Sequence, residues 1–183
     1  MKPILQQAWR ATTLDRRAFG EWLFGSSATG DAALIVIGVG LVRFIVLVLA
    51  SGDFGALVIG VVTTAINALA GWVFLAVATW FAATRLFDGV GDWQTVLRMH
   101  GLAYFANIVS VLSVVRGSIG NWSIIIGYVW FLIAATVGTS VGLSLKTRDA
   151  ALSVLIGAAI LYVIELLFNG AFFGVSQAVS GLF

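Results

Sequence analysis

The 183-residue chain has no cysteine, a single histidine (His100) and a single proline (Pro3). Without cysteine the protein has no disulfide, no thiolate metal site and no cysteine nucleophile. One histidine excludes a multi-histidine metal cluster within one chain and the paired histidines of zinc proteases. We therefore expect no catalytic group, no metal and no cofactor, and a protein that is not an enzyme.

Charged residues are also scarce. They make up 10% of the chain and hydrophobic residues 61%, whereas soluble domains have roughly 25% charged residues. Residues 54–84, 117–145 and 166–183 carry no charge at all, and an apolar run of about 18 residues or more is typical of a membrane-spanning helix. The sequence thus predicts an all-α fold, a polytopic membrane helix bundle. The net charge of +2 does not suggest a nucleic-acid partner.

Five transmembrane helices are predicted from these runs. The first is Ala32–Ala50, the second lies within Phe54–Thr84, and the third is Met99–Val115. The fourth lies within Asn121–Leu145, and the fifth runs from Ala150 to about Phe173. The third is the shortest and most polar. The second run exceeds the length that a bilayer needs, so we expect it to tilt or to begin with an interfacial turn.

Basic residues predict which way the helices cross the membrane. Lys and Arg gather on cytoplasmic loops. Of the nine outside the predicted spans, eight fall on one side: Lys2, Arg10, Arg16, Arg17, Arg85, Arg98, Lys146 and Arg148. We expect a cytoplasmic N-terminus and, because five is odd, a C-terminus outside. The chain divides into a cytoplasmic amphipathic segment, residues 1–30, and a five-span membrane domain, residues 31–183.

The segment before the first span has an amphipathic helical pattern. Its first apolar stripe consists of Ile4, Leu5, Ala8 and Trp9, and its second of Leu14, Ala18, Phe19, Trp22 and Leu23. Thr12 and Asp15 fit a capping box that restarts the helix, and Gly25 is expected to end it in the left-handed conformation. Either this segment lies in the headgroup layer, or it seals the cytoplasmic ends of the bundle.

A short charged loop joins the second and third spans. Its candidate functional residues are Arg85, Gly89, Gly91, Trp93 and Arg98. The glycines permit the positive φ that a tight reversal needs, and the tryptophan suits the membrane interface. The two arginines are expected to face anionic headgroups or the loop's own aspartates, Asp88 and Asp92.

The sequence around this loop carries a family resemblance. It runs Ala83-Thr84-Arg85-Leu86, then Gly89 and Gly91, then Trp93, Leu97-Arg98 and Gly101-Leu102-Ala103-Tyr104. A second block is Trp130 followed by residues 146–152. Together they resemble the bacterial branch of the Yip1 domain family, over roughly residues 30–170. The resemblance implies a five-span adaptor or organising protein of the bacterial inner (cytoplasmic) membrane.

Two charged residues lie inside the predicted spans, Arg43 in the first and Glu165 in the fifth. A charge at mid-bilayer costs about 2.5–3.5 kcal/mol, and at 1.5 Å per residue the two depths differ by roughly 6 Å. We therefore expect them to form an intramembrane ion pair. It is either a structural clamp between the first and last spans or part of a proton or ion relay. Alternatively, Arg43 snorkels outward or pairs with another subunit.

Further polar and small residues predict contacts between spans. Small residues repeat every four positions in two spans: Ala134, Gly138 and Gly142 in the fourth, and Gly170 and Gly174 in the fifth. Such ridges pack a bundle internally or bind another protein. Asn67, Asn107, Asn169, Thr63 and Thr64 are expected to join spans by hydrogen bonds. His100 is expected at the membrane interface and not as a base.

The leading functional hypothesis is a non-enzymatic integral membrane adaptor, scaffold or accessory subunit. Its partners would be other membrane protein subunits, a second copy of itself, or lipids of the bilayer. The alternative is a small transporter or channel that uses the Arg43/Glu165 pair, which would need a polar path at mid-membrane.

Overall fold

The computed structural model describes residues 4–25, 27–51, 57–115 and 118–180, without the side chains of residues 51, 58, 114, 118, 121, 165 and 168–180. Over this part of the chain it is all-helical, with no strand. The elements are α1 (Ile4–Thr12), α2 (Arg16–Leu23), α3 (Ala28–Ser51), α4 (Leu57–Leu86), α5 (Trp93–Ala103), the 3-10 helix η1 (Tyr104–Val114), α6 (Ser118–Gly142) and α7 (Thr147–Ser180).

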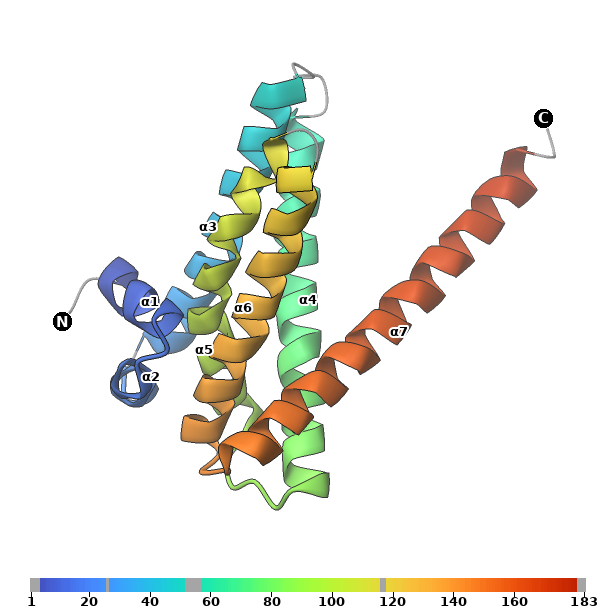
Figure 1. Cartoon of the computed structure of the whole chain (residues 1–183). Helices are drawn as coiled ribbons and strands as arrows, with labels where there is room; N and C mark the ends of the chain where they lie inside the picture. The colour runs from blue at the N-terminus through green and yellow to red at the C-terminus, as the bar shows by residue number, and fades with distance from the viewer. Residues whose placement is uncertain (1–3, 26, 52–56, 116–117, 181–183) are drawn as a thin grey trace.

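Five helical stretches are long and apolar enough to cross a membrane. They are Ala28–Ala50, Ile59–Leu86, Trp93–Ser113, Trp122–Gly142 and Thr147–Ile164. The predicted all-α bundle with five transmembrane helices is therefore confirmed. In Figure 1 α3, α4, α5–η1 and α6 run side by side, whereas α7 crosses the foot of α4 and then leaves the bundle. Phe54 and Gly55, where an interfacial turn was expected, lie outside the described residues.

The third span occupies the centre of the bundle. Half of an 18-residue stretch within Trp93–Ser113 is buried inside the protein, against 22–39% of the corresponding stretches of the other four spans, because α5 packs on α2, α3, α4 and α6. It begins at Trp93, earlier than the predicted Met99. A central helix meets protein on most sides, so it tolerates polar residues that a lipid-facing helix does not.

The second half of this span is wound as a 3-10 helix. α5 and η1 have 11 residues each, and at about 1.5 and 2.0 Å per residue they extend roughly 38 Å, enough for a hydrocarbon layer of about 30 Å. Helix α6 approaches η1 closely because Gly127 has no side chain: a Cβ there would lie 3.3 Å from the Ser110 nitrogen.

The N-terminal segment forms two helices, but their boundary differs from the prediction. Asp15 is itself the N-cap of α2, and its Oδ1 accepts from the Arg17 N–H at 2.9 Å. Thr12 still belongs to α1, so the Thr12–Asp15 capping box is wrong. Leu14 takes the left-handed conformation with φ 62°. Gly25 has no positive φ, because α2 ends at Leu23 with Phe24 as its C-cap.

Helix α2 packs its apolar face on the bundle. Ala18 and Phe19 are fully buried and Trp22 is nearly so, against α5 and α6. The segment therefore packs against the side of the bundle (Figure 1), and its place in the headgroup layer or at the cytoplasmic ends of the spans stays a prediction. Leu5, Trp9 and Phe24 are exposed instead. The first predicted stripe is therefore wrong in part: α1 buries Ala8 and Ala11, and turns Leu5 and Trp9 outward.

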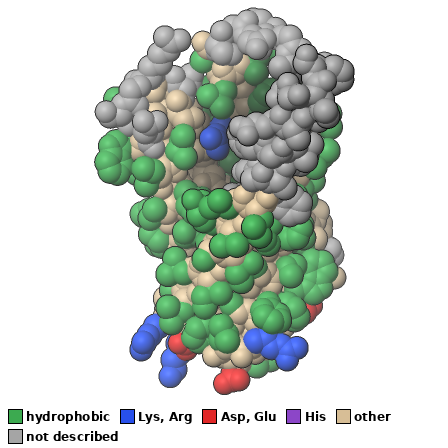
Figure 2. Space-filling view, turned by 90° about the vertical axis from the view of Figure 1, so that its right-hand side faces the viewer, with side chains coloured by type: hydrophobic (Ala, Val, Ile, Leu, Met, Phe, Trp, Pro, Cys, Tyr) green, Lys and Arg blue, Asp and Glu red, His purple; other side chains and the backbone are tan. Residues whose placement is uncertain are grey.

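The surface separates by polarity. Figure 2 shows charged side chains gathered at the lower end of one face, below an apolar zone. Within that zone one basic side chain is visible, next to atoms drawn in grey. Acidic side chains lie at this end as well, among them exposed Asp88 and Asp92 of the α4–α5 loop; we refer to it as the basic end for its exposed Lys and Arg. Its exposed basic residues are Arg16, Arg17, Arg85, Lys146 and Arg148.

Candidate functional site

A cavity of about 500 Å³ lies among the spans. Residues of α3, α4, η1, α6 and α7 line it, so it is formed only when all five spans assemble. Its polar lining is contributed by Arg43, Thr64, Asn67, Tyr104, Asn107, Ser110 and Tyr128. The sequence singled out several of these residues separately. Their convergence on one space is visible only in the fold.

Arg43 brings a positive charge to this cavity. Among the side chains that the structure describes, no acidic group lies within salt-bridge distance of it; the ion pairs seen there are Arg10–Asp15 and Arg10–Glu21. Glu165 lies on α7 four residues after Leu161, which lines the cavity. The Glu165 side chain is outside the described residues, so the Arg43–Glu165 ion pair stays a prediction.

The amides and hydroxyls near Arg43 do not join the spans as expected. Thr63 donates to the carbonyls of Ile59 and Gly60 within its own helix, at 2.9 and 3.2 Å. Asn67 and Asn107 face the cavity and have no hydrogen-bonded partner for their side chains among the described residues. The side chain of Asn169 lies outside the described residues.

His100 does not lie at the interface, contrary to expectation. It is fully buried in the bundle, where its Nε2 lies 3.1 Å from the Thr139 hydroxyl. Its ring packs edge-on against the Phe131 ring, with 6.3 Å between the two ring centroids. Its Nδ1 has no hydrogen-bond partner among the described atoms. Sequence position suggested an interface because the start of the helix was placed at Met99. The span starts six positions earlier, at Trp93.

The expectation of no catalytic group assumed that the Gly-x-Ser-x-Gly spacing of serine hydrolases is absent from the sequence, and this is wrong because residues 138–142 have it. The hydrolase motif requires a sharp turn between a strand and a helix. Here the five residues are the last turn of α6, and Ser140 is buried. Its hydroxyl donates to the Leu145 carbonyl at 2.8 Å and accepts from Arg16 at 3.0 Å. Ser140 therefore holds the α6–α7 turn together.

The α4–α5 loop is fixed by its backbone. The Gly89 N–H donates to the Ala83 carbonyl at 3.0 Å, and the Val90 N–H donates to the Leu143 carbonyl at 3.1 Å, which ties this loop to the α6–α7 turn. Gly91 has φ +150°, and a Cβ there would lie 2.6 Å from the Leu143 side chain. Gly89 has no positive φ; the left-handed residue is Asp88, with φ 54°.

The two loop arginines have different roles. Arg85 is exposed, and its guanidinium lies 6.0 Å from the Phe81 ring. Arg98 does not face headgroups. Its Nε donates to the Thr29 hydroxyl at 2.8 Å, and its Nη1 donates to the Leu23 carbonyl at 3.4 Å. Arg98 therefore connects α5 to the end of α2 and the start of α3. Trp93, the first residue of α5, is partly exposed.

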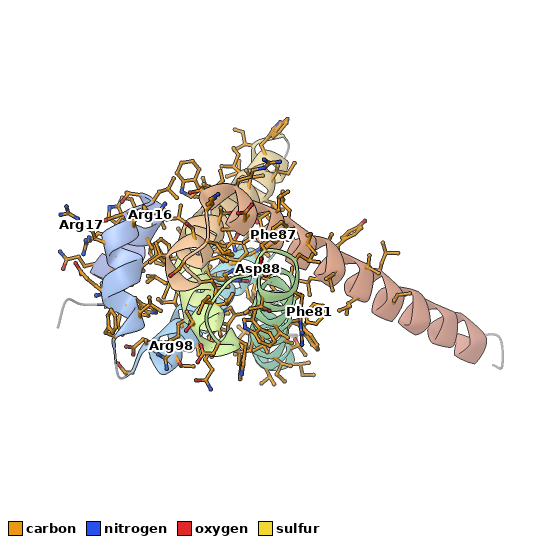
Figure 3. The ribbon with its side chains drawn as sticks, turned by 90° about the horizontal axis from the view of Figure 1, so that it is seen from below. Arg16, Arg17, Phe81, Phe87, Asp88 and Arg98 are labelled. Carbon is orange, nitrogen blue, oxygen red and sulfur yellow. The ribbon has the colours of Figure 1, made fainter. Side chains whose placement is uncertain are left out.

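Side-chain bonds also hold α1 and α2 to the bundle. The Trp130 indole of α6 donates to the Thr12 carbonyl at 2.8 Å, and Arg16 donates to Ser140. Within the segment, Arg10 bonds Asp15 and Glu21, and its hydrogen bond lowers the pKa of the Asp15 carboxyl. Viewed from below, in Figure 3, Arg17 lies on the side of the N-terminal helices that is turned away from the other helices.

The small-residue ridge of α6 faces other helices of the same chain. Ala134 is fully buried. A Cβ at Gly138 would lie 3.0 Å from both Met99 and Phe19, and one at Gly142 would lie 2.9 Å from Thr95. The ridge thus receives α5 and α2. The surroundings of Gly170 and Gly174 lie outside the described residues.

No group of three or more His, Cys, Asp or Glu side chains converges within the described part of the chain. Comparison with protein-family models, with curated proteins and with solved structures finds no match to this chain. The resemblance to the Yip1 domain family accordingly stays a prediction. Five apolar helices make the chain an integral membrane protein.

Proposed function

We propose that the protein is a non-enzymatic membrane adaptor or accessory subunit that presents a rigid, positively charged face to a partner membrane protein. The observation that carries this proposal is the way α1 and α2 are bound to the bundle. Trp130 and Arg98 reach from the bundle to this segment or its flanks, and Arg16 reaches from α2 to Ser140 of α6, at 2.8–3.4 Å. Such bonds fix the charged surface in one arrangement, and preorganisation favours binding.

The proposal includes an orientation. The basic end faces the cytoplasm of a bacterial cell, with the chain in the inner membrane, because Lys and Arg are retained on that side. Trp9 and Phe24, exposed on the N-terminal segment, suit the headgroup layer. The resemblance to the Yip1 domain family supports the same arrangement. The partner is a membrane protein with an acidic cytoplasmic surface, since charge complementarity guides such encounters.

Site-specific photo-crosslinking in native membranes tests this function. A photoreactive residue replaces Arg17 or Lys146 at the basic end, and Tyr162, exposed on α7, serves as the lipid-facing control. We expect one discrete protein adduct from the two basic-end positions and lipid adducts from Tyr162. Charge reversal at Arg148 should abolish the protein adduct. Lipid adducts alone at all three positions would refute the adaptor function.

The alternative function, a small transporter or channel, is favoured by one observation, the cavity that holds Arg43 among the spans. A transport path needs polar groups at mid-membrane, and the cavity supplies them. Ion or anion flux in proteoliposomes that is lost in Arg43→Gln would establish it. An impermeable wild-type protein would leave the adaptor function as the explanation.

A further inference from the structure

We propose that the cavity among the spans binds the phosphate group of a membrane phospholipid, with Arg43 as its charged anchor. This inference is independent of the adaptor function, which rests on the opposite end of the molecule. Its basis is the chemistry of the cavity lining: one guanidinium, two side-chain amides and several hydroxyls, surrounded by apolar residues.

The depth of Arg43 requires a nearby anion. Arg43 comes eight positions before the end of α3 at Ser51, which places it about 12 Å from that end of the helix at 1.5 Å per residue. A charge inside the hydrocarbon layer is costly unless it is paired or drawn toward the interface. No described acidic side chain pairs with it. A phosphate at the nearer interface is close enough for the long Arg43 side chain to meet it.

The donors around Arg43 suit a phosphate. Guanidinium presents five N–H donors in a planar fork and binds phosphate oxygens in a bidentate manner. Asn67 and Asn107 add amide donors, and Thr64 adds a hydroxyl. These groups come from α3, α4 and η1, so they surround one space from three helices. A site rich in donors and bearing one positive charge favours an anion with several acceptor oxygens.

The apolar lining points to a lipid as the source of the phosphate. Phe44, Leu47, Ile124 and Leu161 line the same cavity. A volume of about 500 Å³ falls within the usual range of ligand sites, roughly 300–1,000 Å³, yet cannot enclose two acyl chains, so the chains must extend into the bilayer. Helix α7 lines the cavity through Leu161 and then diverges from the other spans (Figure 1).

Native mass spectrometry of the full chain in mild detergent tests the site. Phosphatidylglycerol is titrated into wild-type protein, into Arg43→Gln and into the control Arg85→Gln, which removes an exposed arginine outside the cavity. We expect one tightly bound lipid on the wild type and on Arg85→Gln. Because a charge-assisted bond is lost, Arg43→Gln should bind about tenfold more weakly or worse. Asn67→Ala, which leaves the charge in place, should weaken binding to a smaller extent.

Three outcomes would overturn the site. Equal lipid affinity in Arg43→Gln and the wild type would exclude Arg43 as the anchor. Displacement of the lipid by millimolar inorganic phosphate would show that the cavity takes a soluble anion. Binding that is absent in the wild type but present in Glu165→Gln would show that Arg43 is neutralised by its own chain. If Arg43→Gln fails to fold, the comparison of Asn67→Ala with Arg85→Gln decides the matter.

Discussion

Gly101 lies where α3, α4 and α5 meet, and replacing it with alanine should destabilise the bundle. A Cβ at this position of α5 would lie 2.5 Å from the Ala32 Cβ and 3.1 Å from both the Ala32 Cα and the Trp72 ring. The contact with Ala32 cannot be relieved by rotating a side chain, because an alanine has none to rotate, so α3 and α5 must move apart. Overpacking of this kind costs about 1–3 kcal/mol.

The matched control is Gly38→Ala in α3, where nothing lies within 4 Å of the added Cβ. Both changes remove a glycine from a helix interior, which favours the helix by up to about 1 kcal/mol. That contribution cancels between the two variants. Gly101→Ala should therefore be about 1–3 kcal/mol less stable than Gly38→Ala, measured as free energy of unfolding in mixed micelles titrated with a denaturing detergent.

A second substitution separates this explanation from a general loss of stability. Ala32→Gly removes the methyl group that the new Cβ meets, so the double variant should recover part of the loss. Residues in direct contact show coupling energies of about 0.5–3 kcal/mol. If Gly101→Ala is as stable as Gly38→Ala, or if the effects of Gly101→Ala and Ala32→Gly simply add, then α3 and α5 are not packed as described.

Three other predictions concern the cap of α5 at Asp92, the Trp130–Thr12 hydrogen bond and the topology of the chain. Hydrogen bonds from the Thr95 side chain and backbone N–H hold the pKa of Asp92 below its ordinary 3.8, so its charge stabilises α5 above that pH, and the effect is lost as pH falls through the lowered pKa. Asp92→Asn keeps a capping side chain without the charge. The wild type should therefore have a higher free energy of unfolding than Asp92→Asn at pH 7, and this difference should shrink at pH 3. Trp130→Phe removes the donor to Thr12, which should cost about 1 kcal/mol and speed hydrogen exchange in α1, while α7 is unaffected. A topology reporter inserted at Gly89 should read as cytoplasmic, and one fused after Phe183 should read as non-cytoplasmic. If both reporters lie on the same side of the membrane, the five-span topology is wrong.

The spans could be predicted because apolar length alone determines them. A helix that faces lipid must be apolar around most of its surface, and α3, α4 and α6 meet that requirement. The third span was placed too late because α5 is central and includes charged Arg98 and polar His100 near its start. Hydropathy measures exposure to lipid, so it underestimates a helix whose neighbours are protein.

The candidate site could be predicted only in part. The charge of Arg43 inside a span is unusual enough to be noticed in the sequence. Arg43 lines the same cavity as Asn67 and Asn107 because of how three helices are rotated about their axes. This convergence also depends on η1 being a 3-10 helix, which changes the direction of every side chain along it. The role of Arg98 was missed for a similar reason: its acceptors, Thr29 and the Leu23 carbonyl, are about 70 residues away in the chain.

The indole bonds of this fold place unequal constraints on the residues that make them. Trp72, Trp80 and Trp130 donate to the carbonyls of Leu97, Gly91 and Thr12, and a main-chain carbonyl is present whatever the side chain. The bond itself therefore places no requirement on the side chain of the acceptor residue, while each donor position requires an indole. Random mutagenesis selected for assembly should tolerate change at Thr12, which is outside the buried core, far more readily than at Trp130.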